Sequence, residues 1–124
     1  MAQYVRPVVI SALDGEFLQF TTVNNAAGGN IAAPAGISGA IIRVYKLYLV
    51  FSGNTNITFQ DASTALSGPM AMLANGSITL PMDGTPWFTT SVGNAFNINS
   101  SQAVQVSGAV YFTQLPTLNA FSGI

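Results

Sequence analysis

The sequence contains no cysteine and no histidine. Without cysteine there is no disulfide framework, no thiolate nucleophile and no cysteine-ligated metal site. Without histidine the chain lacks the commonest general base and the commonest transition-metal ligand, and a Ser–His–Asp triad cannot form within it. We therefore predict a protein that is not an enzyme, with no catalytic residues, no metal site and no cofactor.

Charge is scarce as well: only 6 % of the residues are charged, against roughly 25 % in a typical soluble domain. The three basic residues cannot supply the ~6–10 phosphate contacts of a strong DNA-binding protein, so we expect no nucleic-acid partner. The 41 residues from 84 to 124 carry no charge at all. A neutral surface suits packing against copies of itself, because no charge has to be desolvated, and we predict an oligomer.

Long hydrophobic runs are also missing. The most apolar stretch, residues 40–51, is 12 residues long and contains Arg43 and Lys46, whereas a transmembrane helix needs ~20 apolar residues. The N-terminus lacks the basic start and the long apolar run of a signal peptide. We expect a protein that is made in the cytoplasm and has no membrane partner.

What the chain does contain is a series of short β-prone runs separated by turn-forming residues. No segment shows the apolar spacing of an amphipathic helix. Eight or nine strands at roughly ten-residue spacing predict one all-β domain, an antiparallel β-sandwich of the jelly-roll type. The expected strands are residues 4–10, 17–23, 40–51, 56–60, 70–73, 77–80, 95–99 and 104–113.

Three connections have recognisable turn chemistry. Residues 13–16, with the sequence LDGE, are typical of a hairpin between the first two strands. Residues 24–39 are rich in Asn, Ala, Gly and Pro and predict a long loop. The dipeptide Asn75-Gly76 predicts a two-residue type I′ hairpin between residues 70–73 and 77–80.

The strand at residues 40–51 does not alternate between apolar and polar positions, unlike the strand at residues 104–113. A sandwich strand needs only one apolar face, so burial of both faces requires a second surface. We interpret that surface as another subunit of a homotrimer; the alternative is a cover formed by the loop at residues 24–39. The predicted interface consists of the even-numbered side chains Ile42, Val44, Tyr48 and Val50.

The C-terminal segment, residues 115–124, combines a strand breaker with evenly spaced apolar residues. Pro116 disfavours continuation as an interior strand. We predict a docking arm that is ordered by a partner, and the alternative is packing onto its own domain. The expected organisation is residues 1–12 as an N-terminal arm and first strand, 13–114 as the sandwich and 115–124 as the arm. The docking side chains would be Leu115, Leu118, Phe121 and Ile124.

Four acidic residues could form sites. Asp14 and Glu16 could bind Ca²⁺, but two acids in a hairpin turn are more often solvated turn residues. Asp61 and Asp83 could act as the acid and base of a glycosidase. Each also lies in a turn signal, where an aspartate bonds to the local backbone, and we favour that interpretation.

The aromatic residues offer another possibility. Trp87 and Phe88, with Tyr45, Tyr48 and Tyr111, could form a platform for sugars. Core packing is the commoner role of such rings, so we favour it for most of them.

Six segments carry a resemblance to a known family: RVYKL at 43–47, ALSGPM at 65–70, LANGSI at 73–78, PWFTT at 86–90, GNAFNI at 93–98 and AVQVSG at 103–108. They resemble small virion proteins encoded by tailed bacteriophages, and the resemblance covers roughly residues 41–113. It implies a jelly-roll-like sandwich, commonly trimeric, that serves as a capsid decoration (cement) protein or as a tail-fibre module, with no catalytic residues.

From these observations we expect a capsid decoration protein that binds the outside of a phage head and bridges neighbouring major capsid subunits. Such work needs shape-matched neutral surfaces and extended arms, and it needs no acid, base or metal. Its partners would be copies of itself and the phage major capsid protein, and its location the capsid surface. The alternative is a receptor- or glycan-binding module of a tail fibre.

Overall fold

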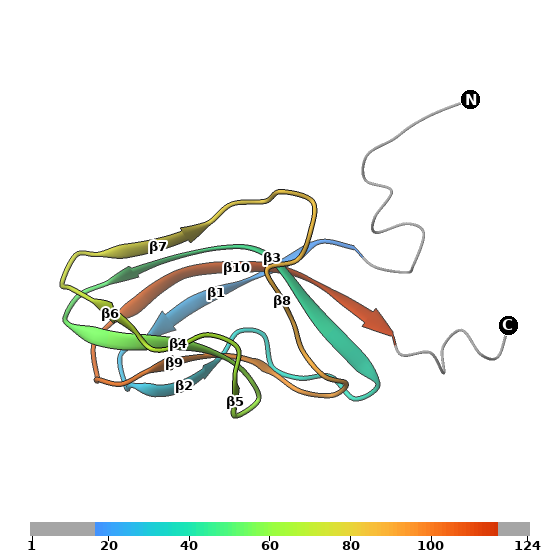
Figure 1. Cartoon of the computed structure of the whole chain (residues 1–124), viewed down its shortest axis with the longest axis horizontal. Coiled ribbons are helices and arrows are strands. Elements are labelled where there is room, and N and C mark those ends of the chain that lie inside the picture. The colour runs from blue at the N-terminus through green and yellow to red at the C-terminus, as the bar shows by residue number, and fades with distance from the viewer. Residues whose placement is uncertain (1–16, 117–124) are drawn as a thin grey trace, which may run out of the picture.

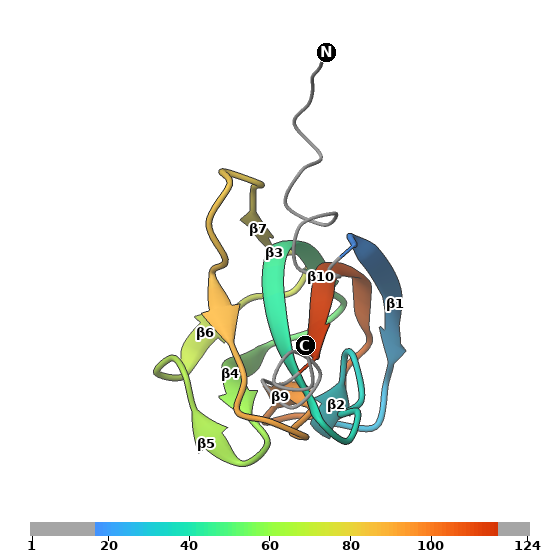
Figure 2. The same cartoon turned by 90° about the vertical axis from the view of Figure 1, so that its right-hand side faces the viewer.

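A computed structural model describes residues 17–116 and folds them into two antiparallel sheets that pack face to face (Figures 1 and 2). This arrangement confirms the predicted all-β sandwich. No helix in the described range is long and apolar enough to span a bilayer. Sheet A has the order β1 (Gln19–Asn25), β10 (Val106–Pro116), β3 (Ala40–Phe51), β7 (Ser77–Leu80), and β8 (Phe88–Thr89) also pairs with β3. Sheet B has the order β2 (Gly29–Ala32), β9 (Phe96–Ser100), β4 (Thr55–Asp61), β5 (Thr64–Ala65), and β6 (Met70–Met72) also pairs with β4.

The core lies between the two sheets and is formed by the inward-facing apolar side chains of both. Three phenylalanine rings pack together in it: the centroid of Phe59 lies 5.0 Å from that of Phe88 and 5.8 Å from that of Phe96. Full burial of one such side chain contributes about 1.5–3 kcal/mol. The largest side chains with almost no exposure are Phe51, Phe59, Phe96, Ile42, Leu47, Leu49, Ile57 and Ile98.

A β-bulge in β3 explains why this strand does not alternate. Its register with β10 shifts between Tyr111, which lies opposite Lys46, and Phe112, which lies opposite Val44. Tyr45 is therefore one extra residue in β3, and such an insertion changes which side chains face inward. The buried positions change accordingly from the even-numbered residues before the bulge to the odd-numbered residues after it. They are Ala40, Ile42 and Val44, then Leu47, Leu49 and Phe51.

The bulge corrects the predicted subunit interface. Ile42 and Val44 are 0 % exposed and belong to the core of their own chain, so their burial requires no second subunit. Tyr48 and Val50 are 43 % and 48 % exposed on the outer face of sheet A. The four predicted residues thus lie on two opposite faces of β3, and only Tyr48 and Val50 remain available to a partner.

Two predicted connections are wrong. The expected loop at residues 24–39 contains β2, which pairs with β9. Asn75 and Gly76 do not close a hairpin, because β6 pairs with β4 in sheet B and β7 with β3 in sheet A. A type I′ turn would need positive φ at both Asn75 and Gly76, but of these two residues only Asn75 has one, at +66°. Gly76 donates its N–H to the Leu73 carbonyl at 2.9 Å. This turn carries the chain from one sheet to the other.

The predicted strand at residues 104–113 corresponds to β10, which runs further than expected. Leu115 pairs with Ile41, so Leu115 belongs to the sandwich and the predicted boundary of the arm is too early. Beyond Phe112, where pairing with β1 ends, β10 has β3 as its only described neighbour, and Pro116 is compatible with such a position. Leu118, Phe121 and Ile124 lie outside the described residues, as do the predicted strand at residues 4–10 and the turn at 13–16.

The described chain enters and leaves the sandwich at the same end. β1 and β10 are antiparallel neighbours, with Gln19 opposite Phe112. Figure 1 shows that β1 begins and β10 ends at the right-hand end of the two sheets.

Candidate functional site: the outer face of sheet A

The outer face of sheet A carries exposed aromatic and aliphatic side chains on three adjacent strands. Phe20 on β1 is 62 % exposed, and its ring centroid lies 5.6 Å from that of Tyr111 on β10. Tyr48 on β3 lies opposite Ala109 of β10. Tyr111 is two residues further along β10, so its ring is within reach of a diagonal contact with Tyr48. We call Phe20, Tyr48, Val50 and Tyr111 the outer apolar surface.

A cation–π pair adds positive charge to this surface. Lys46 lies on β3 opposite Tyr111, and its Nζ is 5.0 Å from the centroid of the Tyr111 ring. Such a contact contributes about 0.5–1 kcal/mol at an exposed site. Both cations within residues 17–116, Lys46 and Arg43, belong to β3, so sheet A carries positive charge beside its apolar side chains.

The outer face of sheet B is different in kind, because amide side chains dominate it. Asn99 on β9 donates from Nδ2 to Oδ1 of Asn30 on β2 at 2.7 Å. Asn97 donates from Nδ2 to the carbonyl oxygen of Ala62 at 2.7 Å. Thr58 on β4 lies opposite Asn99. The outer face of sheet A therefore carries exposed apolar side chains together with positive charge, whereas that of sheet B carries amide groups, and the outer face of sheet A is the candidate binding surface.

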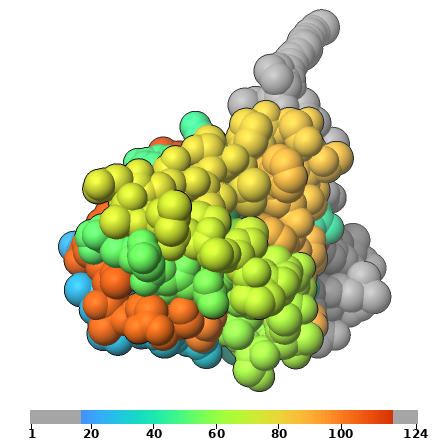
Figure 3. Space-filling view, turned by 60° about the vertical axis from the view of Figure 1, so that its left-hand side comes forward, coloured from blue at the N-terminus to red at the C-terminus, as the bar shows by residue number. Residues whose placement is uncertain are grey.

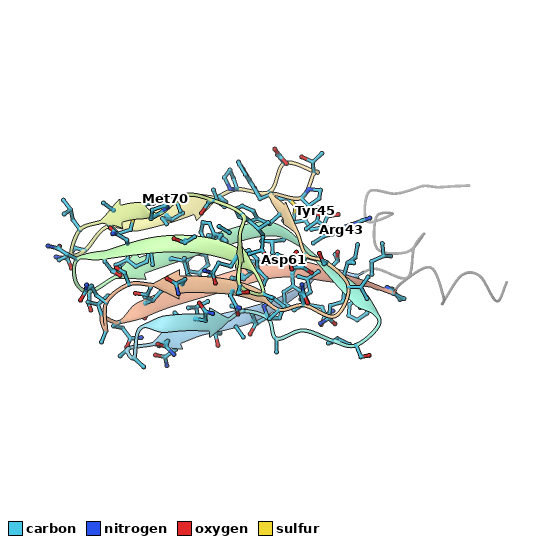
Figure 4. The ribbon with its side chains drawn as sticks, turned by 60° about the horizontal axis from the view of Figure 1, so that its bottom comes forward. Arg43, Tyr45, Asp61 and Met70 are labelled. Atoms are coloured by element: carbon cyan, nitrogen blue, oxygen red, sulfur yellow. The ribbon has the colours of Figure 1, made fainter. Side chains whose placement is uncertain are left out.

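The two described carboxylates, Asp61 and Asp83, each accept hydrogen bonds from a different loop. Asp61 is labelled in Figure 4 and lies at the end of β4. It accepts hydrogen bonds from the Ser91 N–H at 3.0 Å, the Ser91 hydroxyl at 2.9 Å and Asn94 Nδ2 at 2.9 Å. Asp83 accepts from both the N–H and the hydroxyl of Thr85, each at 3.0 Å. Asp83 thus bonds within its own turn, as the favoured interpretation expects, whereas Asp61 bonds to a distant loop instead of its local backbone.

The environment of Asp61 lowers the pKa of its carboxyl group. Partial burial by itself raises this pKa, but the three hydrogen bonds from Asn94 and Ser91 favour the ionised form and bring the pKa below its ordinary value. The negative charge therefore holds residues 91–94 against the end of β4.

We expect Asp61→Asn to destabilise the protein at pH 7 by about 1 kcal/mol, since hydrogen bonds to a partly exposed charged group are weakened by solvent. Because the pKa of Asp61 is lower in the folded protein than in the unfolded chain, its ionised carboxylate stabilises the fold at pH values above the unfolded-state pKa of ~3.9. This stabilisation is lost as the pH falls through the folded-state pKa. Thermal melts between pH 7 and pH 2.5 check this. The gap between wild type and variant should close towards low pH, and a constant gap would contradict the assignment.

The predicted aromatic platform is only partly formed. Tyr45 is buried, with 4 % exposure, and Phe88 packs against Phe59 and Phe96, so neither is available to a ligand. Trp87 is 41 % exposed, and its Nε1 donates to the carbonyl oxygen of Pro81 at 2.8 Å. Figure 3 shows the loop at residues 81–87, in gold, at the molecular surface.

No group of three or more acidic, histidine or cysteine side chains that could hold a metal ion occurs within residues 17–116. Asp14 and Glu16, the candidate Ca²⁺ ligands, lie outside this range.

Phe20, the most exposed member of the outer apolar surface, was not among the residues predicted to bind a partner. The sequence contains no clear signal for it, because apolar residues occur here at odd positions (Phe17, Val23) and at even positions (Leu18, Phe20) alike. Only the burial of Val23 in the structure places Phe20, by alternation along β1, on the outer face.

Comparisons with known proteins add little to these observations. No protein-family model matches the sequence, and no curated protein matches it significantly. Three chains of solved structures match, among them one from the structure titled "Bacillus endospore appendages form a novel family of disulfide-linked pili". It is 16 % identical, covers 82 % of this chain and 88 % of that chain, and has a TM-score of 0.49. A likeness at this level carries no inference about function.

Proposed function

We propose that this protein is a non-enzymatic structural component of a bacteriophage virion, a capsid decoration protein that binds the outside of the head and bridges major capsid subunits. One observation carries the proposal: the outer apolar surface of sheet A is unlike the amide-rich outer face of sheet B. Contiguous exposed apolar side chains on a small protein mark a surface that binds another protein. The resemblance of residues 41–113 to small phage virion proteins supports the assignment to the capsid.

In this proposal sheet A faces the capsid and sheet B faces solvent. Phe20, Tyr48 and Tyr111 would be covered by apolar side chains of the capsid protein, and aromatic residues supply much of the binding energy of protein interfaces. The amide groups of sheet B would stay hydrated. No protonation or bond cleavage is required, because binding alone holds the neighbouring capsid subunits together.

The test is to locate the protein on purified particles of the phage that encodes it, by cryo-electron microscopy with an antibody against sheet B. We expect density on the head lattice, and absence from the particles would overturn the proposal. A second measurement is binding of the added protein to heads that lack it. Tyr48→Asp should reduce occupancy at least tenfold, whereas Thr58→Asp on the outer face of sheet B should leave it unchanged.

A second candidate function is a glycan- or receptor-binding module of a tail fibre. The exposure of Trp87 and Tyr48 favours it, because sugars stack on exposed aromatic rings. Density on the tail in the same experiment would support this candidate and overturn the first.

A further inference from the structure

The free edges of the two sheets differ in how well they are protected against pairing with another chain. Within the described residues, the edge strands β2, β5, β7 and β8 are only two to four residues long, and β6 has three residues. Proline follows β7 directly at Pro81 and precedes β6 directly at Pro69. Short length and proline are two of the ways in which natural proteins block edge-to-edge pairing.

The edge formed by β1 has none of these protections. β1 is seven residues long, contains no proline and no charged residue, and pairs with β10 in a regular register without a bulge. Its other side has no described neighbour. An edge strand of this length offers a row of backbone N–H and C=O groups to an incoming strand.

We propose that β1 pairs antiparallel with β1 of a second copy of this chain, about a twofold axis at Thr22. The strand suits itself as a partner, because like charges directly opposite each other destabilise a strand pair and β1 has none. Thr22 would face Thr22 of the second copy, which is a favourable cross-strand pair. Phe20 would face Asn24 of the second copy on the exposed side of the sheet.

This pairing has a geometric consequence. A twofold axis between antiparallel strands stands perpendicular to their sheet, so both copies present the outer face of sheet A on the same side. The path β1-β10-β3-β7 would continue into its counterpart as one sheet, with the two outer apolar surfaces side by side. The proposal does not depend on attachment to a capsid, although a doubled surface would strengthen any binding to a regular lattice through effective concentration.

The first test is the mass of the full-length protein in solution by light scattering across micromolar concentrations. We expect a dimer of twice 12.9 kDa. Thr22→Lys places a charge opposite its own copy and should raise the dimer dissociation constant at least tenfold. Thr79→Lys, on the exposed face of the short edge strand β7, is the matched control and should leave the constant unchanged. Melting curves of both variants would show that each still folds.

The second test uses the absence of native cysteine. Thr22→Cys should form a disulfide-linked dimer under mild oxidation, because Cα atoms directly opposite in an antiparallel pair are ~4.5–5.5 Å apart and disulfides join Cα atoms at ~4.4–6.8 Å. Thr79→Cys should cross-link at least tenfold more slowly.

Three results would overturn the proposal. A monomer that does not cross-link at position 22 excludes the strand pair. A monomer with slow amide exchange along the free side of β1 would indicate that another segment of the same chain covers this edge. A trimer, as predicted from the sequence, would require a different contact, because a twofold strand pair closes at two copies.

Discussion

Replacing Gly108 by alanine should destabilise the sandwich by about 3–5 kcal/mol, a large effect for the gain of a single methyl group. Gly108 lies opposite Leu49 in the β10–β3 pair and has φ +154°. A Cβ atom at this position would overlap the carbonyl oxygen of Tyr48 and lie 3.1 Å from the Cα of Leu49. Both obstacles are backbone atoms, so relief requires the two longest strands to move apart.

Urea unfolding of both proteins at pH 7 measures this effect as a lower midpoint with little change in slope. Gly68→Ala is the matched control, because a Cβ atom at Gly68 would meet nothing within 4 Å and the φ of this residue is not in the left-handed region. We expect the control to change the free energy of unfolding by less than about 1 kcal/mol. Equal effects of the two substitutions would contradict the close approach of β10 to β3.

Phe59→Ala should lower the free energy of unfolding by about 3–5 kcal/mol, because it removes one of the buried rings that pack across the two sheets. Phe59 is 2 % exposed on β4 of sheet B, and it contacts Phe88 on β8 of sheet A as well as Phe96 on β9. We expect the melting temperature to fall by about 10–20 °C.

Leu73→Ala is the control for this substitution. Leu73 is 70 % exposed, so its truncation should change the free energy of unfolding by less than about 0.5 kcal/mol. If Phe59→Ala lowered the free energy of unfolding by less than about 1 kcal/mol, the two sheets would not pack through the phenylalanine rings.

The all-β sandwich was predictable from the sequence because period-2 runs and turn residues are local signals. Most strands were found within a few residues of their observed positions. The bulge at Tyr45 was missed, since it depends on the register of β3 against β10, which lies more than sixty residues away in the sequence. The same cause explains the wrong hairpin at Asn75-Gly76, where the partners of β6 and β7 come from different sheets.

The candidate surface was predictable in part. Tyr48 and Val50 were expected to lie on a contact face and are exposed, whereas Ile42 and Val44 were grouped with them because the bulge was not visible in the pattern. The hydrogen bonds of Asp83 follow from its neighbour Thr85 and could be anticipated. Those of Asp61 could not, because Ser91 and Asn94 approach it only through the folding of the two sheets.

The position of the chain ends has a mechanical consequence. Because the described chain enters at β1 and leaves at β10 on the same end of the sandwich, tension applied through both ends would pull these antiparallel neighbours apart from one side. Their hydrogen bonds lie perpendicular to the strands, so they would break one pair after another instead of sharing the load. A protein pulled through both ends would therefore unfold at low force, as the β1–β10 hydrogen bonds break in sequence. A protein held through the outer face of sheet A would not load these hydrogen bonds one pair at a time and would resist a higher force.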